Sequence, residues 1–540
     1  MQLLRWFAAL VSLGMALPAA AEDEVPSLAD LEAAGALIGE IRVDTHNIFD
    51  LDDPAENKLP YRVANALHIK TRPELIRRLL LFRPGDRLQV RLLDETERII
   101  RQTSSVYDVE IRPLRYRDGV VDLEVRTRDT WTLEPSVRFR RAGGTNSGAL
   151  SLRETNFLGT GTTLGFERSS SVDRRGHSVE LSHEHLFDGW TSASLEHAKF
   201  NDGSSNSLAI NRPFYALDTR WAAGANVAKF ERLDSLYQAG NNVAEYRHRG
   251  TNAELYGGWS AGLVRGWTHR YSAGVSYRDD AYAVAPGGPP LPAPLPPDRT
   301  LAGPFLRYEA VQDDFMPVMN RDRIRRPEYF QMGLHSTVQV GRSVAAFGST
   351  DQPWQISASV TKGFRVASGH DLLTAANVST QYGGTLGDVR SFGASARYFA
   401  PQGRSHLLYL AAAADVVKSP NVADDLLLGG DNGLRGYPLR YQRGSHRMLF
   451  TAEERYYADW YPLRLFRAGV AAYVDVGRAW GSALANPTGG WLADVGIGLR
   501  FLNARTAFGN VLHVDLAFPV HKTDPAIRSR QLLLMTAKTF

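Results

Sequence analysis

Residues 464–477 read Arg-Leu-Phe-Arg-Ala-Gly-Val-Ala-Ala-Tyr-Val-Asp-Val-Gly, and their side chains alternate in character. In an extended strand, one face would be purely apolar, with Phe466, Ala468, Val470, Ala472, Val474 and Val476. The other face would be small or polar, with Gly469, Ala471, Tyr473, Asp475 and Gly477. A wall between lipid and a wet lumen has this division, so the stretch predicts a strand of a transmembrane β-barrel.

The same alternating pattern continues from residue 131 to residue 540, where short alternating runs are separated by Gly, Asn, Asp and Pro. We count twenty such runs, an even number, as single-chain bacterial barrels require. The sequence therefore predicts an all-β antiparallel barrel over 131–540. The eleventh of these strands is expected at 328–341, after a long link at 314–327.

The links between these runs differ in length in a regular way. Every second link is short, as at 158–161 and 400–403, whereas others are long, as at 280–300 and 418–444. Short periplasmic turns and long outer loops are typical of outer-membrane barrels. The link 314–327 is the exception, because it is long and falls on the predicted periplasmic side.

The N-terminus is typical of a secreted chain. Arg5 precedes an apolar run that ends at Ala19-Ala20-Ala21, so we predict a signal peptide at 1–21 and a short leader at 22–36. No other run is apolar over the roughly 18 residues that a membrane-spanning helix needs. The expected location is the outer membrane of a Gram-negative bacterium, with the lipid bilayer as one partner.

Residues 37–130 contain both helical and strand patterns, unlike the rest of the chain. A strand is expected near Ile38, then a helix opened by a capping box at Thr71-Arg-Pro-Glu74, then a second helix through Leu92 to Ile100. A hairpin around Asp118-Gly119 follows. The order β-α-α-β-β predicts one small α+β domain.

The composition excludes several classes of function. The net charge is +4 and the basic residues are scattered, which gives no case for nucleic-acid binding. The nucleophile, metalloprotease and phosphate-loop motifs are absent, so we predict no enzyme and no cofactor. His183 and His185 share a strand face, but no third ligand is positioned for a metal.

Arg435 and Asp475 form the best candidate site. Asp475 lies on the lumenal face of its strand, where it needs a cation, and Arg435 can supply one if the preceding loop folds into the barrel. A wet lumen would screen the pair, so we expect a strength between that of an exposed and a buried ion pair. Glu453 shares the inward face with Thr451 and Arg455, while Glu454 must then lie near a membrane edge.

Four motifs carry a resemblance to a known superfamily. They are Glu154-Thr-Asn-Phe-Leu-Gly-Thr-Gly161, Gly429-Gly430 with Leu434-Arg435-Gly436-Tyr437, Glu453-Glu-Arg455, and Tyr473-Val-Asp475-Val-Gly477. Together they resemble bacterial outer-membrane assembly factors and two-partner secretion transporters of the BamA/TamA type, the bacterial surface antigen barrels. The domain at 37–130 is similar to a single POTRA domain.

The resemblance implies a fold and a site. It implies sixteen barrel strands rather than our count of twenty, and an inward-folded loop within 418–444. It also implies that Arg435 docks this loop through Asp475, with Glu453 as a second acid. Gly429, Gly430, Gly436 and Tyr437 belong to the same motif and complete the predicted binding residues.

Three functions remain open at this point. The first is assembly or insertion of client outer-membrane proteins, in which the POTRA-like domain binds unfolded segments at a sheet edge and the barrel opens between its first and last strands. The second is a secretion pore that exports an unfolded partner. The third, a barrel enzyme, is disfavoured by the absence of a nucleophile.

Overall fold

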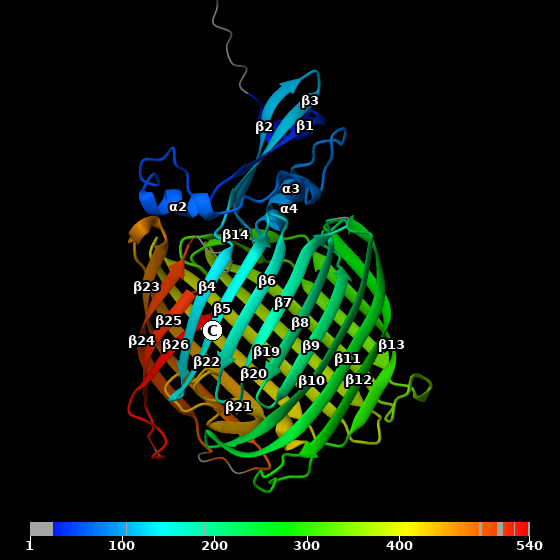
Figure 1. Cartoon of the computed structure of the whole chain (residues 1–540), viewed down its shortest axis with the longest axis vertical. Coiled ribbons are helices and arrows are strands. Elements are labelled where there is room, and N and C mark those ends of the chain that lie inside the picture. The colour runs from blue at the N-terminus through cyan, green and yellow to red at the C-terminus, as the bar shows by residue number, and fades with distance from the viewer. Residues whose placement is uncertain are drawn as a thin grey trace, which may run out of the picture.

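The computed structural model describes residues 25–103, 105–187, 189–484, 486, 489–504, 511–522 and 524–537. The predicted signal peptide and the terminal Phe540 lie outside these residues. The chain forms an α+β domain that sits on one end of a large β-barrel (Figure 1). We call the barrel end beside this domain the near end and the opposite end the far end.

The N-terminal domain has a three-stranded sheet in the order β1-β3-β2, in which β1 is parallel to β3 and β2 antiparallel to it. The turn between β2 and β3 has positive φ at Asp118 and Gly119, as a tight hairpin requires. The elements are α1 (Leu28–Ala33), β1 (Leu37–His46), α2 (Leu59–Leu67), α3 (Pro73–Arg78), α4 (Val90–Ile100), β2 (Val106–Arg117) and β3 (Val120–Asp129).

The core of this domain lies between the sheet and the helices. Ile76 and Leu79 come from the α3 region, Leu93 and Ile100 from α4, and all are almost fully buried. They pack against the buried face of β3, whose residues are Val121, Leu123 and Val125. The apolar periodicity of α4 therefore places its inner face on the sheet.

The capping box predicted at Thr71 is wrong. Helix α3 begins at Pro73 with Arg72 as its N-cap, and no side chain caps it. The Thr71 hydroxyl instead accepts a hydrogen bond from Asn156 Nδ2 at 2.9 Å, and the Thr71 N–H donates to Asp129 at 2.7 Å. Contact with the barrel thus takes the hydroxyl that a local cap would use. Helix α2 is a further element that the sequence pattern did not predict.

Twenty antiparallel strands close the barrel, so the count made from the sequence is confirmed and the sixteen implied by the resemblance are not found. A three-residue strand, β21 (Leu426–Leu428), pairs beside β22 within the far-end loop. The barrel strands are β4 (Leu133–Ala142), β5 (Thr145–Phe157), β6 (Thr162–Ser170), β7 (Arg175–Leu186), β8 (Thr191–Phe200), β9 (Gly203–Arg212), β10 (Trp221–Gln238), β11 (Asn241–Val264), β12 (Trp267–Val284), β13 (Arg299–Gln312), β16 (His335–Arg342), β17 (Trp354–Ala367), β18 (His370–Tyr382), β19 (Val389–Gln402), β20 (His406–Lys418), β22 (Gln442–Tyr457), β23 (Phe466–Gly481), β24 (Leu492–Asn503), β25 (Val511–Pro519) and β26 (Gln531–Ala537).

The outer surface of the barrel is apolar, as the alternation predicts. On β23, Val470 and Val474 are 46% and 43% exposed, whereas the intervening Tyr473 and Asp475 are buried in the interior. The same alternation places Val495, Ile497 and Leu499 of β24 on the outside. The fold is therefore that of a transmembrane barrel. No helix in the described part of the chain is both long and apolar enough to cross a bilayer.

The predicted link at 314–327 and the predicted start of the strand at 328–341 are wrong. This region forms a small hairpin of β14 (Phe315–Met319) and β15 (Pro327–Gln331), and the barrel strand β16 starts only at His335. The strand is interrupted between β15 and β16. The N–H groups of Met332 and Gly333 both donate to the carbonyl of Asp314, and these bonds close the base of the hairpin. A short hairpin strand alternates as a barrel strand does, so the pattern alone did not separate them.

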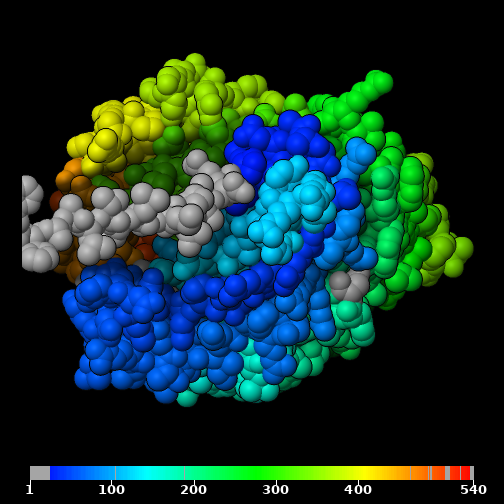
Figure 2. Space-filling model, turned by 90° about the horizontal axis from the view of Figure 1, so that it is seen from above, coloured from blue at the N-terminus to red at the C-terminus, as the bar shows by residue number. Residues whose placement is uncertain are grey.

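The N-terminal domain lies across the near end of the barrel (Figure 2). Glu95 of α4 accepts the N–H of Leu217, in the turn between β9 and β10, at 2.8 Å. Asn156, at the near end of β5, donates to Thr71, and Arg464 pairs with Asp53 at 2.8 Å. The domain is thus held by several separate turns of the barrel. Burial raises the pKa of Glu95, which the hydrogen bond and Arg98 offset only in part.

Candidate functional site

The far-end loop between β20 and β22 folds back into the barrel and carries Arg435 into the interior. Arg435 is 1% exposed. Its Nε donates to Asp475 Oδ2 at 2.7 Å and its Nη2 to Asp475 Oδ1 at 3.0 Å. This two-point contact is the pair that the sequence predicts, and it fixes the orientation of the guanidinium as well as its position.

Two further acids face the same guanidinium. Arg435 Nη1 donates to Glu453 Oε2 at 3.3 Å and to Asp515 Oδ2 at 3.2 Å. The guanidinium also lies 3.2 Å from the centroid of the Tyr473 ring. Three inward-facing carboxylates from β22, β23 and β25 therefore surround one cation. We call this cation, its three carboxylates and the loop residues 429–437 the latch.

A second layer of arginines balances the charge of these acids. Arg455 Nε and Arg500 Nη2 each donate to Glu453 Oε1 at 3.0 Å, and Arg500 also pairs with Asp515. The Thr451 hydroxyl donates to Asp475 at 2.8 Å. Every carboxylate of the latch is thus hydrogen-bonded, which a buried charge requires.

The backbone of the loop is fitted to the barrel wall at Gly436. The Gly436 N–H donates to Asp494 Oδ2 at 3.0 Å, and a Cβ at this position would lie 2.7 Å from the Cβ of Asp494. The next residue, Tyr437, is fully buried, and its hydroxyl donates to the carbonyl of Ala493 at 3.0 Å. Only a residue without a side chain allows this approach between loop and wall.

Gly429 and Gly430 mark the point where the loop turns inward. Both have positive φ, at 138° and 39°, and a Cβ on Gly429 would lie 2.3 Å from the carbonyl oxygen of Pro438. On the outer side of the loop, Arg440 donates to both carboxylate oxygens of Asp173, at 2.8 and 2.7 Å. The loop is therefore held at two levels, one buried and one partly exposed.

The structure changes one expectation about the latch and supplies residues that sequence reasoning missed. The pair was expected in a wet, screening lumen, but Arg435, Glu453, Asp475 and Asp515 are all almost fully buried. Loop packing removes the solvent, so the energetics are those of a buried ion pair. The missed residues are Asp494, Arg500 and Asp515, although each lies on the polar face of an alternating run, which is the signal that identified Asp475.

Other candidate residues lie where the pattern placed them or have ordinary partners. Glu454 faces outward near the near end of β22, where it pairs with His406 at 3.2 Å. His183 contacts the Thr162 hydroxyl and His185 the carbonyl of Gly189, so the two rings have separate partners. Among the described residues, no three His, Cys, Asp or Glu side chains are arranged to hold a metal.

The extent of pairing at the seam between the last and first strands is another feature that the residues alone did not reveal. In the part of the chain that the structure describes, β26 pairs with β4 at one position, Leu534 with Arg141. On its other side, β26 pairs with β25 at seven positions. The described seam therefore has far less backbone pairing than the neighbouring strand pair.

Fold and site together define a transmembrane β-barrel with an α+β domain at one end and an inward-folded loop held by buried charges. Similar solved structures include BamA from Haemophilus ducreyi lacking POTRA domains 1-3, which is 14% identical with a TM-score of 0.39 over 91% of this chain and 84% of that one. CdiB from Acinetobacter baumannii is 12% identical with a TM-score of 0.46, over 93% and 73% of the two chains. The FrpB iron transporter from Neisseria meningitidis, in its apoprotein form, is 10% identical with a TM-score of 0.37, over 80% and 86%. No protein-family model and no curated protein matches the sequence.

Proposed function

We propose that this protein assists the insertion of client β-barrel proteins into the outer membrane of a Gram-negative bacterium. The domain at 37–130 then lies in the periplasm and is of the POTRA type. No covalent step and no cofactor are needed, because the protein acts by binding unfolded segments and lowering the barrier to their insertion. The barrel at 131–540 spans the bilayer, with the loop at 418–444 folded into it.

The observation that carries this proposal is the sparsely paired seam. In the described part of the seam, each strand residue without a backbone pair leaves groups that must find partners, because lipid offers none. An incoming client strand can supply those partners at the edge of β4 or β26. Among the described residues, opening the seam breaks one residue pair, Leu534 with Arg141, whereas opening between β25 and β26 breaks seven.

The N-terminal domain offers a place for a client before insertion. Strand β2 is an edge of its sheet, and part of that edge is already occupied. Glu97 accepts the N–H of Ile111 at 2.7 Å, and Arg101 donates to the carbonyl of Val109. The remaining part, from Arg112 to Arg117, includes Leu114, which is 39% exposed, and is the edge where we place client segments.

A disulfide across the seam tests the insertion mechanism. The chain contains no cysteine, so Arg141→Cys with Leu534→Cys gives one defined pair at directly opposed positions. The protein is reconstituted in liposomes, and folding of an unfolded barrel client is followed by its protease resistance. We expect the oxidised lock to abolish client folding and a reductant to restore it. The matched control is Leu516→Cys with Leu532→Cys, which locks β25 to β26. Full activity of the oxidised seam lock would refute the insertion mechanism.

A photo-crosslinking residue at Leu114 tests the client site in cells. The control places the same residue at Leu59 of α2, which is 74% exposed but has no strand edge. Capture of several barrel precursors from Leu114 and not from Leu59 supports the proposal. Capture of one large secreted partner instead would favour the alternative, a secretion pore.

A further inference from the structure

The β14–β15 hairpin and its tip, residues 320–326, lie inside the near end of the barrel. Ile324 at the tip is 2% exposed and belongs to an apolar cluster with inward-facing wall residues. These wall residues come from β19, β20, β22, β24 and β25, and are Phe399, Leu407, Tyr409, Tyr457, Leu502 and Val511. The hairpin leaves the wall between β13 and β16, so it crosses the lumen to the opposite side.

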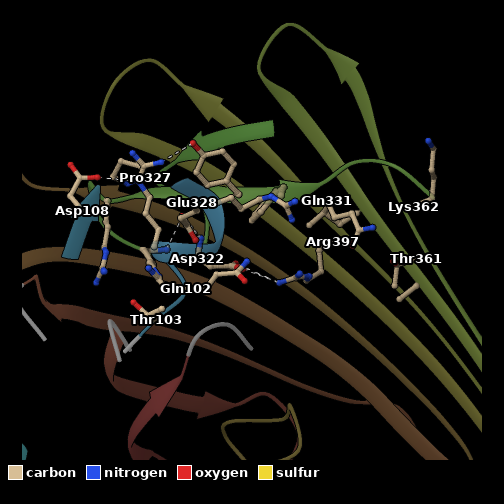
Figure 3. A pocket seen from close by; sticks show the side chains of 18 of the residues that line it. Gln102, Thr103, Asp108, Asp322, Pro327, Glu328, Gln331, Thr361, Lys362 and Arg397 are labelled. Carbon is tan, nitrogen blue, oxygen red and sulfur yellow. Dashed lines mark hydrogen bonds and ion pairs between the residues drawn. The ribbon is translucent and has the colours of Figure 1, made fainter. Parts of the chain in front are cut away.

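Polar contacts fix the tip to the wall. Arg321 is buried, donates to Asp371 of β18 at 2.8 Å and donates to the carbonyl of Gly369 at 2.9 Å. Asp322 faces Arg397 of β19 at 3.4 Å (Figure 3). The carbonyl of Arg321 accepts a hydrogen bond from Arg455 Nη1 at 3.1 Å. Because Arg455 also donates to Glu453, the hairpin and the latch share one buried hydrogen-bond network.

The other side of the hairpin contacts the N-terminal domain through three arginine–aromatic pairs. Arg101 donates to the Tyr329 hydroxyl at 3.2 Å, and the Arg98 guanidinium lies 3.8 Å from the Phe315 ring centroid. Arg326 of the tip lies 5.1 Å from the ring of Tyr107. These contacts are two cation–π pairs and one hydrogen bond.

A cavity of about 760 Å³ lies beside the hairpin, between the N-terminal domain and the barrel wall. Gln102 and Thr103 line it from the domain, Glu328 and Gln331 from the hairpin, and Thr361 from β17 (Figure 3). The lumen next to the hairpin therefore has space that the hairpin can enter when it moves.

We propose that residues 315–331 form a plug that closes the near end of the barrel, and that the N-terminal domain holds this plug in place. The plug lies between the domain and the lumen, so a movement of the domain away from Tyr329 and Phe315 releases it. The lumen is then closed from both ends, by the plug at the near end and by the latch loop toward the far end. The inference deepens the proposed function, since it assigns a gate to the same barrel, but the plug itself is testable without a client.

The base of the hairpin makes the plug removable. The carbonyl of Asp314 accepts hydrogen bonds from Met332 N–H at 2.8 Å and Gly333 N–H at 2.9 Å, and β13 pairs with β16 directly beyond this point. Residues 315–331 can therefore be replaced by two glycines without changing the register of the barrel strands. The folded state of the variant is checked by its heat-dependent migration in detergent gels.

The test measures access to one lumenal cysteine in the otherwise cysteine-free protein. Ala411→Cys lies on the inward face of β20, packed against the cluster around Ile324. The purified protein is treated with a bulky polyethylene glycol maleimide. Deleting the plug should speed labelling at Ala411→Cys by about tenfold or more, because labelling follows the open fraction. Ala346→Cys, on an exposed far-end loop, should react at the same rate with and without the plug.

A point variant tests the role of the N-terminal domain. Tyr329→Ala removes the hydrogen bond from Arg101 to the plug, and it should speed labelling at Ala411→Cys in the same direction but by less than the deletion. Tyr382→Ala, at an exposed site on β18, should have no effect. Unchanged labelling in the folded deletion variant would overturn the plug. An increase with the deletion but none with Tyr329→Ala would overturn the part assigned to the domain. Neither result depends on the seam lock, so the two proposals fail separately.

Discussion

The latch loop and the plug hairpin both reach into the barrel, but they are held by different forces. The latch places one arginine among three buried carboxylates, with glycines at the close contacts. The plug combines an apolar contact at Ile324 with a buried ion pair between Arg321 and Asp371. A charge network needs an exact geometry of specific residue types, whereas an apolar contact tolerates many. The latch is therefore visible as a sequence motif, and the plug is not.

The two regions also differ in what they connect. The latch joins the far-end loop to four barrel strands, β22, β23, β24 and β25. The plug contacts the domain on one side and the wall on the other. Arg455 joins the two regions, because it donates both to Glu453 and to the carbonyl of Arg321. The comparison indicates a fixed lock at one level and a movable closure at the other.

The largest effect is expected from Arg435→Ala. The change leaves Glu453, Asp475 and Asp515 buried without their shared cation, and breaking a buried ion pair costs about 3–5 kcal/mol. We expect the loop to leave the lumen while the barrel stays folded, since closed strand pairing supports the barrel. The measurement is the proteolysis rate within 418–441, read by mass spectrometry. Arg440→Ala is the control on the same loop, and its partly exposed pair with Asp173 is worth at most about 1 kcal/mol.

Asp475→Asn sharpens the same prediction. Arg435 keeps Glu453 and Asp515 in this variant, so loop release should be milder than in Arg435→Ala. The double variant should be little worse than Arg435→Ala alone, because both residues serve one contact. Fully additive effects in this cycle would mean that the two residues act separately, and the latch would have to be abandoned.

A smaller effect is expected from Ile324→Ala in the plug. Removing a buried Ile side chain typically costs about 2–5 kcal/mol, and the cost here falls on docking of the plug rather than on the barrel. We expect faster labelling of Ala411→Cys and no change in loop proteolysis at 418–441. Ile69→Ala, at a site 54% exposed in the N-terminal domain, is the control. Loop release in Ile324→Ala would show that plug and latch move together and would remove the distinction between them.

Much of the fold follows from local pattern alone. Alternation determines which side of a strand meets lipid, so residues 464–477 and their counterparts were enough to predict a closed barrel of twenty strands. The Arg435–Asp475 pair was also predictable, because an inward acid needs a cation and the loop motif supplies one. Both predictions depend on residues whose neighbours in sequence, an alternating strand or a loop motif, indicate on which side of the barrel wall they lie.

The rest depends on contacts between distant segments. Asp515 joins the latch only because β25 is brought beside β24, and the register that does this is set by the whole barrel. The local sequence predicts Thr71 as a helix cap, yet the Thr71 hydroxyl accepts a hydrogen bond from Asn156 of the barrel. Residues 315–327 of the plug were predicted as a link and residues 328–331 as the start of a barrel strand, because β15 alternates and the hydrogen bonds at Asp314 separate it from β16. Local sequence contains no sign of such partners.

The smallest effect expected is a pH dependence of the plug, which the latch should lack. Glu328 of β15 lies outside the barrel strands and accepts the N–H groups of Arg321, Asp322 and Arg323 at 3.1, 3.2 and 3.1 Å. Burial and then the charge of Asp322 raise the pKa of Glu328 from 4.5 to about 7. When the plug leaves the lumen, this carboxyl regains an ordinary pKa and releases its proton between these values. Docking of the plug is therefore most favoured below pH 4.5, the ordinary pKa of Glu328, and it weakens as the pH rises to about 7, the pKa of Glu328 in the docked plug.

Labelling of Ala411→Cys, normalised to Ala346→Cys at each pH, should rise by up to about tenfold from mildly acidic to mildly alkaline buffer. Burial also raises the pKa of Asp322, so Glu328→Gln should reduce this slope without abolishing it. An undiminished slope in Glu328→Gln would remove Glu328 from the mechanism, and an equal slope in loop proteolysis at 418–441 would mean that the latch, too, responds to pH.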